Sequence, residues 1–251
     1  MKKKIEIKQE ITIEEDNENN NKGLLSKKRI LEICKGLLTF LIFYFSSYLQ
    51  VIPIALFNID VKNYTASDLA IVNTFTDLIL VLILIILYFK ELKKEFKTFK
   101  KNWKLNMDTA FKYWFIGLMI MCISNIAIGI ITNLNTSSNE QAVQTLVSST
   151  PYLMLFTAGI LAPIAEELTF RKGVSKIFKN KWVYATASGL IFGLLHVIGS
   201  GNILEYLYVI PYGSLGFFFA LTYYDTKSIY PSIIMHAIHN SALILLSIFA
   251  Y

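Results

Sequence analysis

The sequence predicts an all-α membrane protein whose chain crosses the bilayer about seven times. Three observations predict this class: 54% of the 251 residues are apolar, only 17% are charged, and the mean hydropathy is positive. The charged residues also collect between long apolar stretches instead of alternating with them. A helix needs about 20 consecutive apolar residues to cross a bilayer, and several stretches meet that length.

Seven stretches qualify as spans. The segment before them, residues 1–30, is rich in lysine, glutamate and asparagine and predicts a disordered cytoplasmic tail. Cys34 and Cys122 are too few and too far apart for a metal or redox motif, and we expect them to be small core residues. The predicted spans lie near Gly36–Ile59, Leu69–Phe89, Tyr113–Ile131, Tyr152–Phe170, Trp182–Ile198, Leu204–Tyr224 and Ile229–Ala250.

The positive charges mark one side of the predicted bundle. Residues 90–104 contain seven lysines and residues 171–181 contain five Lys or Arg, whereas residues 132–150 contain none. Loops rich in Lys and Arg stay in the cytoplasm. We therefore expect a multi-pass protein of the cell membrane with a cytoplasmic N-terminus and an external C-terminus. The net charge of +6 then reflects contact with the lipid bilayer and gives no sign of a nucleic-acid partner.

Two adjacent glutamates, Glu166 and Glu167, interrupt the fourth span. A carboxylate in the bilayer costs at least ~2.5 kcal/mol, so it indicates a functional site. Arg171 shares a helical face with Glu167 and can pair with it. Glu166 lies ~100° away and is left without a local partner, which suits a general base or acid. The alternative is a buried ion-pair cluster that only fixes helix packing.

Pro163 lies one turn before the glutamates. Proline lacks an amide hydrogen and clashes with the carbonyl four residues back, which is that of Gly159. We therefore expect a kink whose freed backbone groups need water or polar side chains as partners.

The fifth span brings a histidine to the same depth. Gly189 and Gly193 allow another helix to approach closely. His196 follows on their face, and Phe192, one turn earlier, can pack under its ring. If the fourth and fifth spans form a hairpin, Glu166 and His196 both lie ~21–24 Å from the turn at 1.5 Å per residue.

The last span carries His236, His239 and Asn240. His236 and Asn240 share a helical face, and His239 is displaced by ~60°. Asn240 offers both a donor and an acceptor. These residues are difficult to explain as lipid contacts, so we expect His236 and Asn240 to hold a polar substrate group. For His239 a supporting and a structural role stay open.

These residues resemble the motifs of the CPBP family, the CAAX-protease and bacteriocin-processing intramembrane proteases. That family shows EExxxR, then FxxxH, then HxxxN or HxxxD, each on a separate helix. The resemblance covers roughly residues 147–245, so we expect N-terminal transmembrane helices over 31–140 and a catalytic helical core over 147–251. In this chain the motifs read Glu166-Glu167-Leu-Thr-Phe-Arg171, Phe192-Gly-Leu-Leu-His196 and His236-Ala-Ile-His-Asn240.

The resemblance implies an intramembrane endopeptidase that hydrolyses a membrane-associated peptide or protein. Glu166 and His196 would activate a water, while His236 and Asn240 would hold the substrate carbonyl and stabilise the oxyanion. Glu166, His196 and His236 could also hold Zn²⁺ with an open position for water, although no HExxH pattern is present. A metal-free water is equally compatible and is slightly favoured. The supporting residues would be Glu167, Arg171 and Phe192.

Two other classes of function compete with an enzyme. A non-catalytic bacteriocin self-immunity or interaction protein could keep the same motifs as a binding scaffold. A proton-coupled transporter could use Glu and His as a relay, but no internal repeat of the kind that many transporters show is visible.

Overall fold

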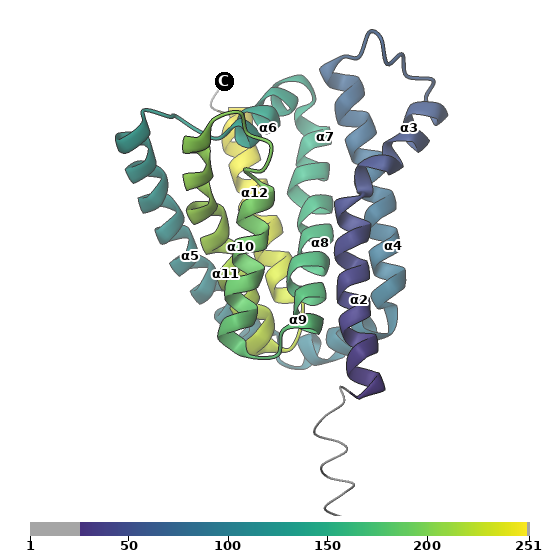
Figure 1. Ribbon diagram of the computed structural model, residues 1–251, viewed down its shortest axis with the longest axis vertical. Helices are drawn as coiled ribbons and strands as arrows, with labels where there is room; N and C mark the ends of the chain where they lie inside the picture. The colour runs from purple at the N-terminus through teal and green to yellow at the C-terminus, as the bar shows by residue number, and fades with distance from the viewer. Residues whose placement is uncertain (1–25, 250–251) are drawn as a thin grey trace, which may run out of the picture.

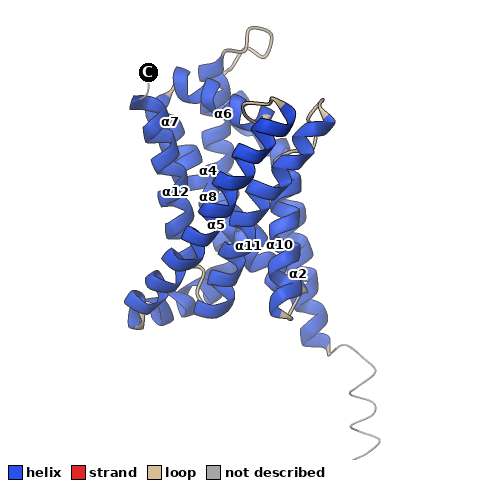
Figure 2. Cartoon of the chain, turned by 90° about the vertical axis from the view of Figure 1, so that its left-hand side faces the viewer, coloured by secondary structure: helices blue, strands red, loops and turns tan. Residues whose placement is uncertain are grey.

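The computed structural model describes residues 26–249 and shows a bundle of helices packed side by side (Figure 1). The described part contains helices and loops and no strand (Figure 2), so the predicted all-α class is confirmed. The predicted tail falls largely on residues 1–25, which lie outside the described residues. Its last residues are helical instead, because the first described helix begins at Lys27, where the Ser26 side chain caps it.

The first half of the described chain forms three long segments. The first bends by 50° between its two apolar parts. A capping box of Thr65 and Asp68 starts the second segment, in which each side chain bonds to the other residue's backbone amide. The elements are α2 (Lys27–Tyr44), η1 (Ser46–Gln50), α3 (Val51–Leu56), α4 (Ala66–Lys101) and α5 (Trp103–Thr132).

The second half begins with a short polar helix at the end of the bundle where the C-terminus lies (Figure 1). A single helical run over residues 151–177 follows, and three further helical segments, over residues 181–195, 203–226 and 230–249, complete the bundle. The elements are α6 (Ser138–Ser149), α7 (Pro151–Phe156), η2 (Thr157–Leu161), α8 (Ala162–Glu166), η3 (Glu167–Gly173), α9 (Val174–Ile177), α10 (Lys181–Leu195), η4 (Ile203–Tyr208), α11 (Val209–Thr226) and α12 (Tyr230–Phe249).

The helices are those of a multi-pass membrane protein, but the count of seven spans is not confirmed. Five helices in the described residues are long and apolar enough to cross a membrane, or six if the bent segment α2–α3 forms one span. The remaining segment, α10, is apolar but has only 15 residues. The predicted span ran on to Ile198, whereas the helix ends at Leu195 and the chain turns at Gly199 with a positive φ of 91°.

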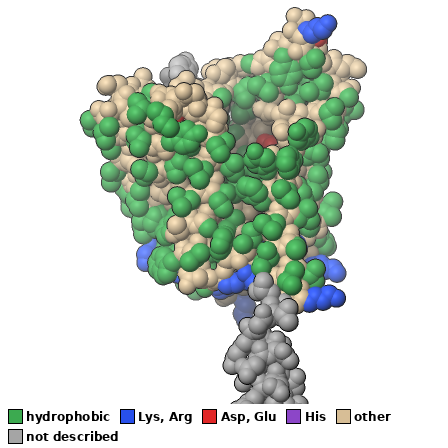
Figure 3. Space-filling model, viewed as in Figure 1, with side chains coloured by type: hydrophobic (Ala, Val, Ile, Leu, Met, Phe, Trp, Pro, Cys, Tyr) green, Lys and Arg blue, Asp and Glu red, His purple; other side chains and the backbone are tan. Residues whose placement is uncertain are grey.

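The outer surface matches a bilayer environment. Hydrophobic side chains cover most of the face shown in Figure 3, and Lys and Arg gather at the lower end, where α2 begins and α9 ends. Cys34 and Cys122 are exposed on this surface. The expectation that they are core residues was wrong, because helices in a bilayer can direct small apolar side chains outward without loss.

Close backbone contact joins α10 to α11. A Cβ atom on Gly193 would lie 2.7 Å from the carbonyl oxygen of Val209, and one on Gly189 would lie 2.7 Å from that of Gly213. The close approach predicted from the two glycines is therefore present. The sequence did not identify α11 as the partner helix.

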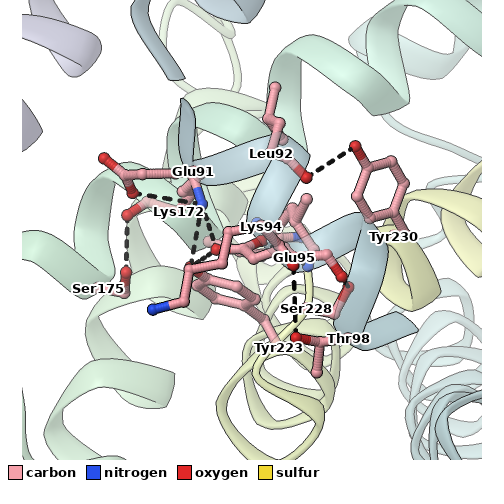
Figure 4. Close-up of polar contacts among 12 residues, drawn as sticks. Glu91, Leu92, Lys94, Glu95, Thr98, Lys172, Ser175, Tyr223, Ser228 and Tyr230 are labelled. Carbon is pink, nitrogen blue, oxygen red and sulfur yellow. Dashed lines mark hydrogen bonds and ion pairs between the residues drawn. The ribbon is translucent and has the colours of Figure 1, made fainter. Parts of the chain in front are cut away.

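A buried charge network ties the helices together at the lysine-rich end (Figure 4). Lys172 is fully buried; it pairs with Glu95 and lies 3.5 Å from Glu91. Glu95 also accepts hydrogen bonds from the backbone N–H of Ile229 (3.0 Å) and the hydroxyl of Tyr223 (3.1 Å). These contacts join η3 to α4, α11 and the start of α12, and so fix the end of the helix that carries the two glutamates.

Candidate active site

The helix that carries the glutamates changes its hydrogen-bond pattern twice. Its segments η2 and η3 are π-helical and lie on either side of the short α8. Single π-helical turns are frequent at functional sites. Pro163 lies in α8 and removes one backbone donor, so carbonyl groups in the turn before it need other partners.

Two side chains of α12 donate hydrogen bonds to carbonyl groups in the turn before Pro163. Asn240 donates its Nδ2–H to the carbonyl oxygen of Ala158 (3.0 Å), and Ser241 donates its hydroxyl to the carbonyl oxygen of Gly159 (3.3 Å). The predicted need for polar partners at Gly159 is thus met by a side chain of α12. These bonds also fix α12 against the π-helical turn and hold Asn240 at the level of the site.

Glu167 and Arg171 form the ion pair that their spacing predicts. The Arg171 Nη2 and Glu167 Oε1 atoms are 3.1 Å apart, and both side chains are completely buried. The guanidinium also lies over the ring of Phe192, 4.5 Å from its centroid. A buried charge pair of this kind is costly to break, because either partner alone would be left uncompensated.

His236 lies between the two glutamates. Its Nδ1 atom is 2.9 Å from Glu167 Oε1, and its Nε2 atom is 3.5 Å from Glu166 Oε2. A carboxylate accepts only, so Nδ1 carries the proton and donates it. The ring is buried and stacks on Phe219, with centroids 5.0 Å apart. The sequence paired Glu166 with His196 by depth, and the structure adds His236 as its contact.

The charges of this cluster balance if His236 is protonated on both ring nitrogens. Glu166 and Glu167 then contribute −2, and Arg171 with His236 contributes +2. Neutral clusters are favoured in a low-dielectric interior, because an unpaired charge is heavily penalised there. In this state the Nε2–H of His236 is a charged donor at the edge of the site.

His196 caps the end of α10 and presents one ring nitrogen to the site. Its Nδ1 atom lies 2.8 Å from the carbonyl oxygen of Phe192. Because a carbonyl only accepts, Nδ1 is the donor and Nε2 keeps its lone pair. The ring lies between Phe192 and Tyr212, with centroid distances of 4.4 and 4.5 Å. The predicted packing of Phe192 under this ring is therefore present.

A cavity of about 390 Å³ brings the predicted residues together. It extends from the glutamate and histidines to α6 and the last turns of α12, at the end of the bundle opposite the lysines (Figure 1). Glu167 and Arg171 are not among the lining residues and lie behind the cavity wall. The predicted site residues that line the cavity are Glu166, Phe192, His196, His236 and Asn240, and His239 joins them.

Several residues at the site were missed by the sequence analysis. Tyr212 stacks on His196 and shares a hydrogen bond with the Ser137 hydroxyl (2.8 Å), while Asp77 of α4 lies within electrostatic range of Glu166. An aspartate within an apolar span was a usable signal. No feature of the sequence indicated Tyr212, because its contact with His196 depends on which helix packs beside α10. His239 accepts a hydrogen bond from Trp114 Nε1 (3.4 Å), which gives it a supporting contact.

The predicted zinc ligands do not fit a metal ion. No group of three His, Cys, Asp or Glu side chains within residues 26–249 is placed to hold one. We therefore derive no step through a metal.

Comparison with known proteins agrees with the motifs. Residues 148–242 match the family model described as type II CAAX prenyl endopeptidase Rce1-like. The "Putative membrane peptidase YdiL" of Bacillus subtilis (strain 168) is 30% identical over 115 residues, which cover 45% of this chain and 44% of that protein. The "UPF0177 protein YbdI" of Lactococcus lactis subsp. lactis (strain IL1403) is 28% identical over 171 residues, which cover 65% and 89%.

The class defined by fold and site is a polytopic helical membrane protein with a Glu/His cluster inside the bundle. Within that class, residues 148–242 are similar to the type II CAAX prenyl endopeptidase Rce1-like family, which agrees with the resemblance that the three motifs carry. The match covers less than half the length of the Bacillus protein. No solved structure matches the chain.

Proposed function

We propose that the protein is an intramembrane endopeptidase that hydrolyses a peptide bond of a membrane-associated peptide or protein. The observation that carries this proposal is the convergence of Glu166, His196, His236 and Asn240, from three helices, on one cavity. Two of these groups accept protons and two donate hydrogen bonds, which is the set that amide hydrolysis by water requires.

In the proposed reaction, a water molecule is held between the carboxylate of Glu166 and the Nε2 lone pair of His196. Glu166 takes one proton from the water while the water oxygen bonds to the scissile carbonyl carbon. The carbonyl oxygen becomes an oxyanion. When the C–N bond breaks, Glu166 returns the proton to the leaving nitrogen, so the carboxylate is regenerated and no other reactant is consumed.

The oxyanion is proposed to be stabilised by two donors from α12. The first is the Nε2–H of His236, and the carboxylate of Glu167 orients its ring through the 2.9 Å bond to Nδ1. Asn240 uses one N–H on the carbonyl of Ala158 and keeps the second. Donors held in advance at the place where charge develops contribute most to such reactions.

The test is cleavage of peptides by the protein purified in detergent micelles. Glu166→Gln removes the base, retains the volume and is expected to abolish cleavage with little change in thermal unfolding. Ser241→Ala is the matched control, because it removes a polar contact of the same π-helical turn without touching the proposed water; it should keep most activity. Full activity of Glu166→Gln would refute the proposal.

A further inference from the structure

The cavity wall carries negative charge and no lysine or arginine. Of its lining residues, the carboxyl groups are Glu166 at the floor and Glu140 on α6. Among residues 26–249, Glu140 forms no ion pair with a cation. Its side chain is partly buried and accepts one hydrogen bond, from Gln144 Nε2 at 3.1 Å. It is therefore a carboxylate available to a ligand in the cavity.

Cations elsewhere in the described residues cannot compensate an anion in this cavity. Arg171 is fully buried behind the floor and paired with Glu167. Lys62 belongs to the loop between α3 and α4 and does not line the cavity. The other lysines lie mainly at the opposite end of the bundle (Figure 3).

Beyond the one donor that His236 is proposed to give the oxyanion, the three histidines offer little to a carboxylate of the substrate. His236 already meets two carboxylates, and His239 uses Nδ1 as an acceptor for Trp114. His196 donates Nδ1–H to a backbone carbonyl and presents a lone pair at Nε2. A substrate carboxylate bound away from the proposed oxyanion position would therefore be desolvated without a positive partner, which strongly disfavours binding.

On the basis of the proposed peptidase function, we propose that the substrate is a peptide segment without acidic residues near the scissile bond, with a Lys or Arg bound at Glu140. The apolar part of the wall, which includes Val143, Val147, Leu243 and Ile244, would contact the neighbouring side chains.

The experiment has two stages and uses the full chain in detergent micelles. A library of peptides from digested total cell protein is incubated with the protein, and new termini are identified by mass spectrometry after subtraction of a Glu166→Gln sample. The best-cleaved sequence is then synthesised with Lys, Gln or Glu at the position that the library shows to be most biased.

Wild-type protein should cleave the Lys peptide best and the Glu peptide worst. Glu140→Lys should lower kcat/KM for the Lys peptide and raise it for the Glu peptide, each by about tenfold, because an attractive contact becomes repulsive. The Gln peptide should change little. Gln141→Lys is the matched control, since it places a lysine at the next position of α6, outside the lining, and should leave the ranking unchanged.

Glu140→Gln, which keeps the shape of the side chain, should reduce the preference without reversing it, and it covers the case in which Glu140→Lys fails to fold. An unchanged ranking in both Glu140 variants, or library sites enriched in Asp and Glu, would overturn the charge preference alone. If wild-type protein cleaves no peptide above the Glu166→Gln background, the proposed function fails together with this inference.

Discussion

Breaking the buried ion pair behind the site should separate stability from catalysis. In Glu167→Gln the side chain keeps its volume but loses its charge. The guanidinium of Arg171 then stays buried, and none of its three nitrogens has a hydrogen-bond partner. The guanidinium then contacts only the rings of Phe192 and Phe219, whose centroids lie 4.5 and 5.8 Å from Arg171 Cζ.

Leaving one member of a buried pair uncompensated costs about 3–5 kcal/mol. For a protein of this size, 1 kcal/mol shifts the unfolding midpoint by about 2–4 °C, so the midpoint should fall by roughly 6–20 °C. The double variant Glu167→Gln/Arg171→Met removes both charges and should recover most of this loss. Its activity should stay at least about tenfold reduced, because His236 has lost the carboxylate that orients it.

The assay is thermal unfolding followed by tryptophan fluorescence, together with peptide cleavage at a temperature where all variants are folded. Asp225→Asn is the control, because it breaks the Lys181 ion pair, whose side chains are 28% and 30% exposed. It should cost less than about 1 kcal/mol. The reasoning is refuted if Glu167→Gln is no less stable than Asp225→Asn, or if the double variant is as unstable as the single one.

Three shorter predictions follow. Gly193→Ala should lower the free energy of unfolding by about 1–3 kcal/mol and reduce cleavage, because the new Cβ would lie 2.7 Å from the α11 backbone. Gly129→Ala is the control and should do neither, because the atom nearest to its new Cβ is 3.5 Å away. Equal unfolding midpoints for the two variants would contradict this prediction. Asn240→Ala should reduce kcat more than KM if it stabilises the oxyanion; a change in KM alone would not fit. The predicted orientation, with the lysine-rich loops in the cytoplasm, can be tested in a background without native cysteines. Gln141→Cys should react with a membrane-impermeant maleimide on intact cells, and Lys100→Cys should not. The reverse labelling pattern would show that the protein has the opposite orientation.

The sequence predicted best what depends on one helix at a time. Glu167 and Arg171 are four residues apart, as are Phe192 and His196, so helical geometry alone brings each pair together. Both contacts are present. The helical class follows equally directly from the length of the apolar stretches, since backbone groups in lipid must be satisfied within the helix.

Features that depend on a second helix were not predictable. The bond from His236 to Glu167 joins residues 69 positions apart, and no local pattern indicates which face of α12 lies against η3. The π-helical turns have the same origin, because carbonyl groups of η2 accept hydrogen bonds from Asn240 and Ser241 of α12. Carbonyl groups of η3 accept from Tyr184 and Ser188 of α10. The length of α10 was overestimated because apolar residues continue beyond its end at Leu195, where the backbone turns.

The donor geometry also leads to a prediction about metal dependence. A metal ion needs at least three protein donors placed around one point, and no group of three His, Cys, Asp or Glu side chains within residues 26–249 is placed in that way. We therefore expect cleavage to persist in 1,10-phenanthroline and EDTA, elemental analysis to find less than one zinc per chain, and added Zn²⁺ to leave the unfolding midpoint unchanged. Loss of activity with chelator that Zn²⁺ restores, together with a stoichiometric ion and a raised midpoint, would show that the two histidines and Glu166 rearrange to bind a metal.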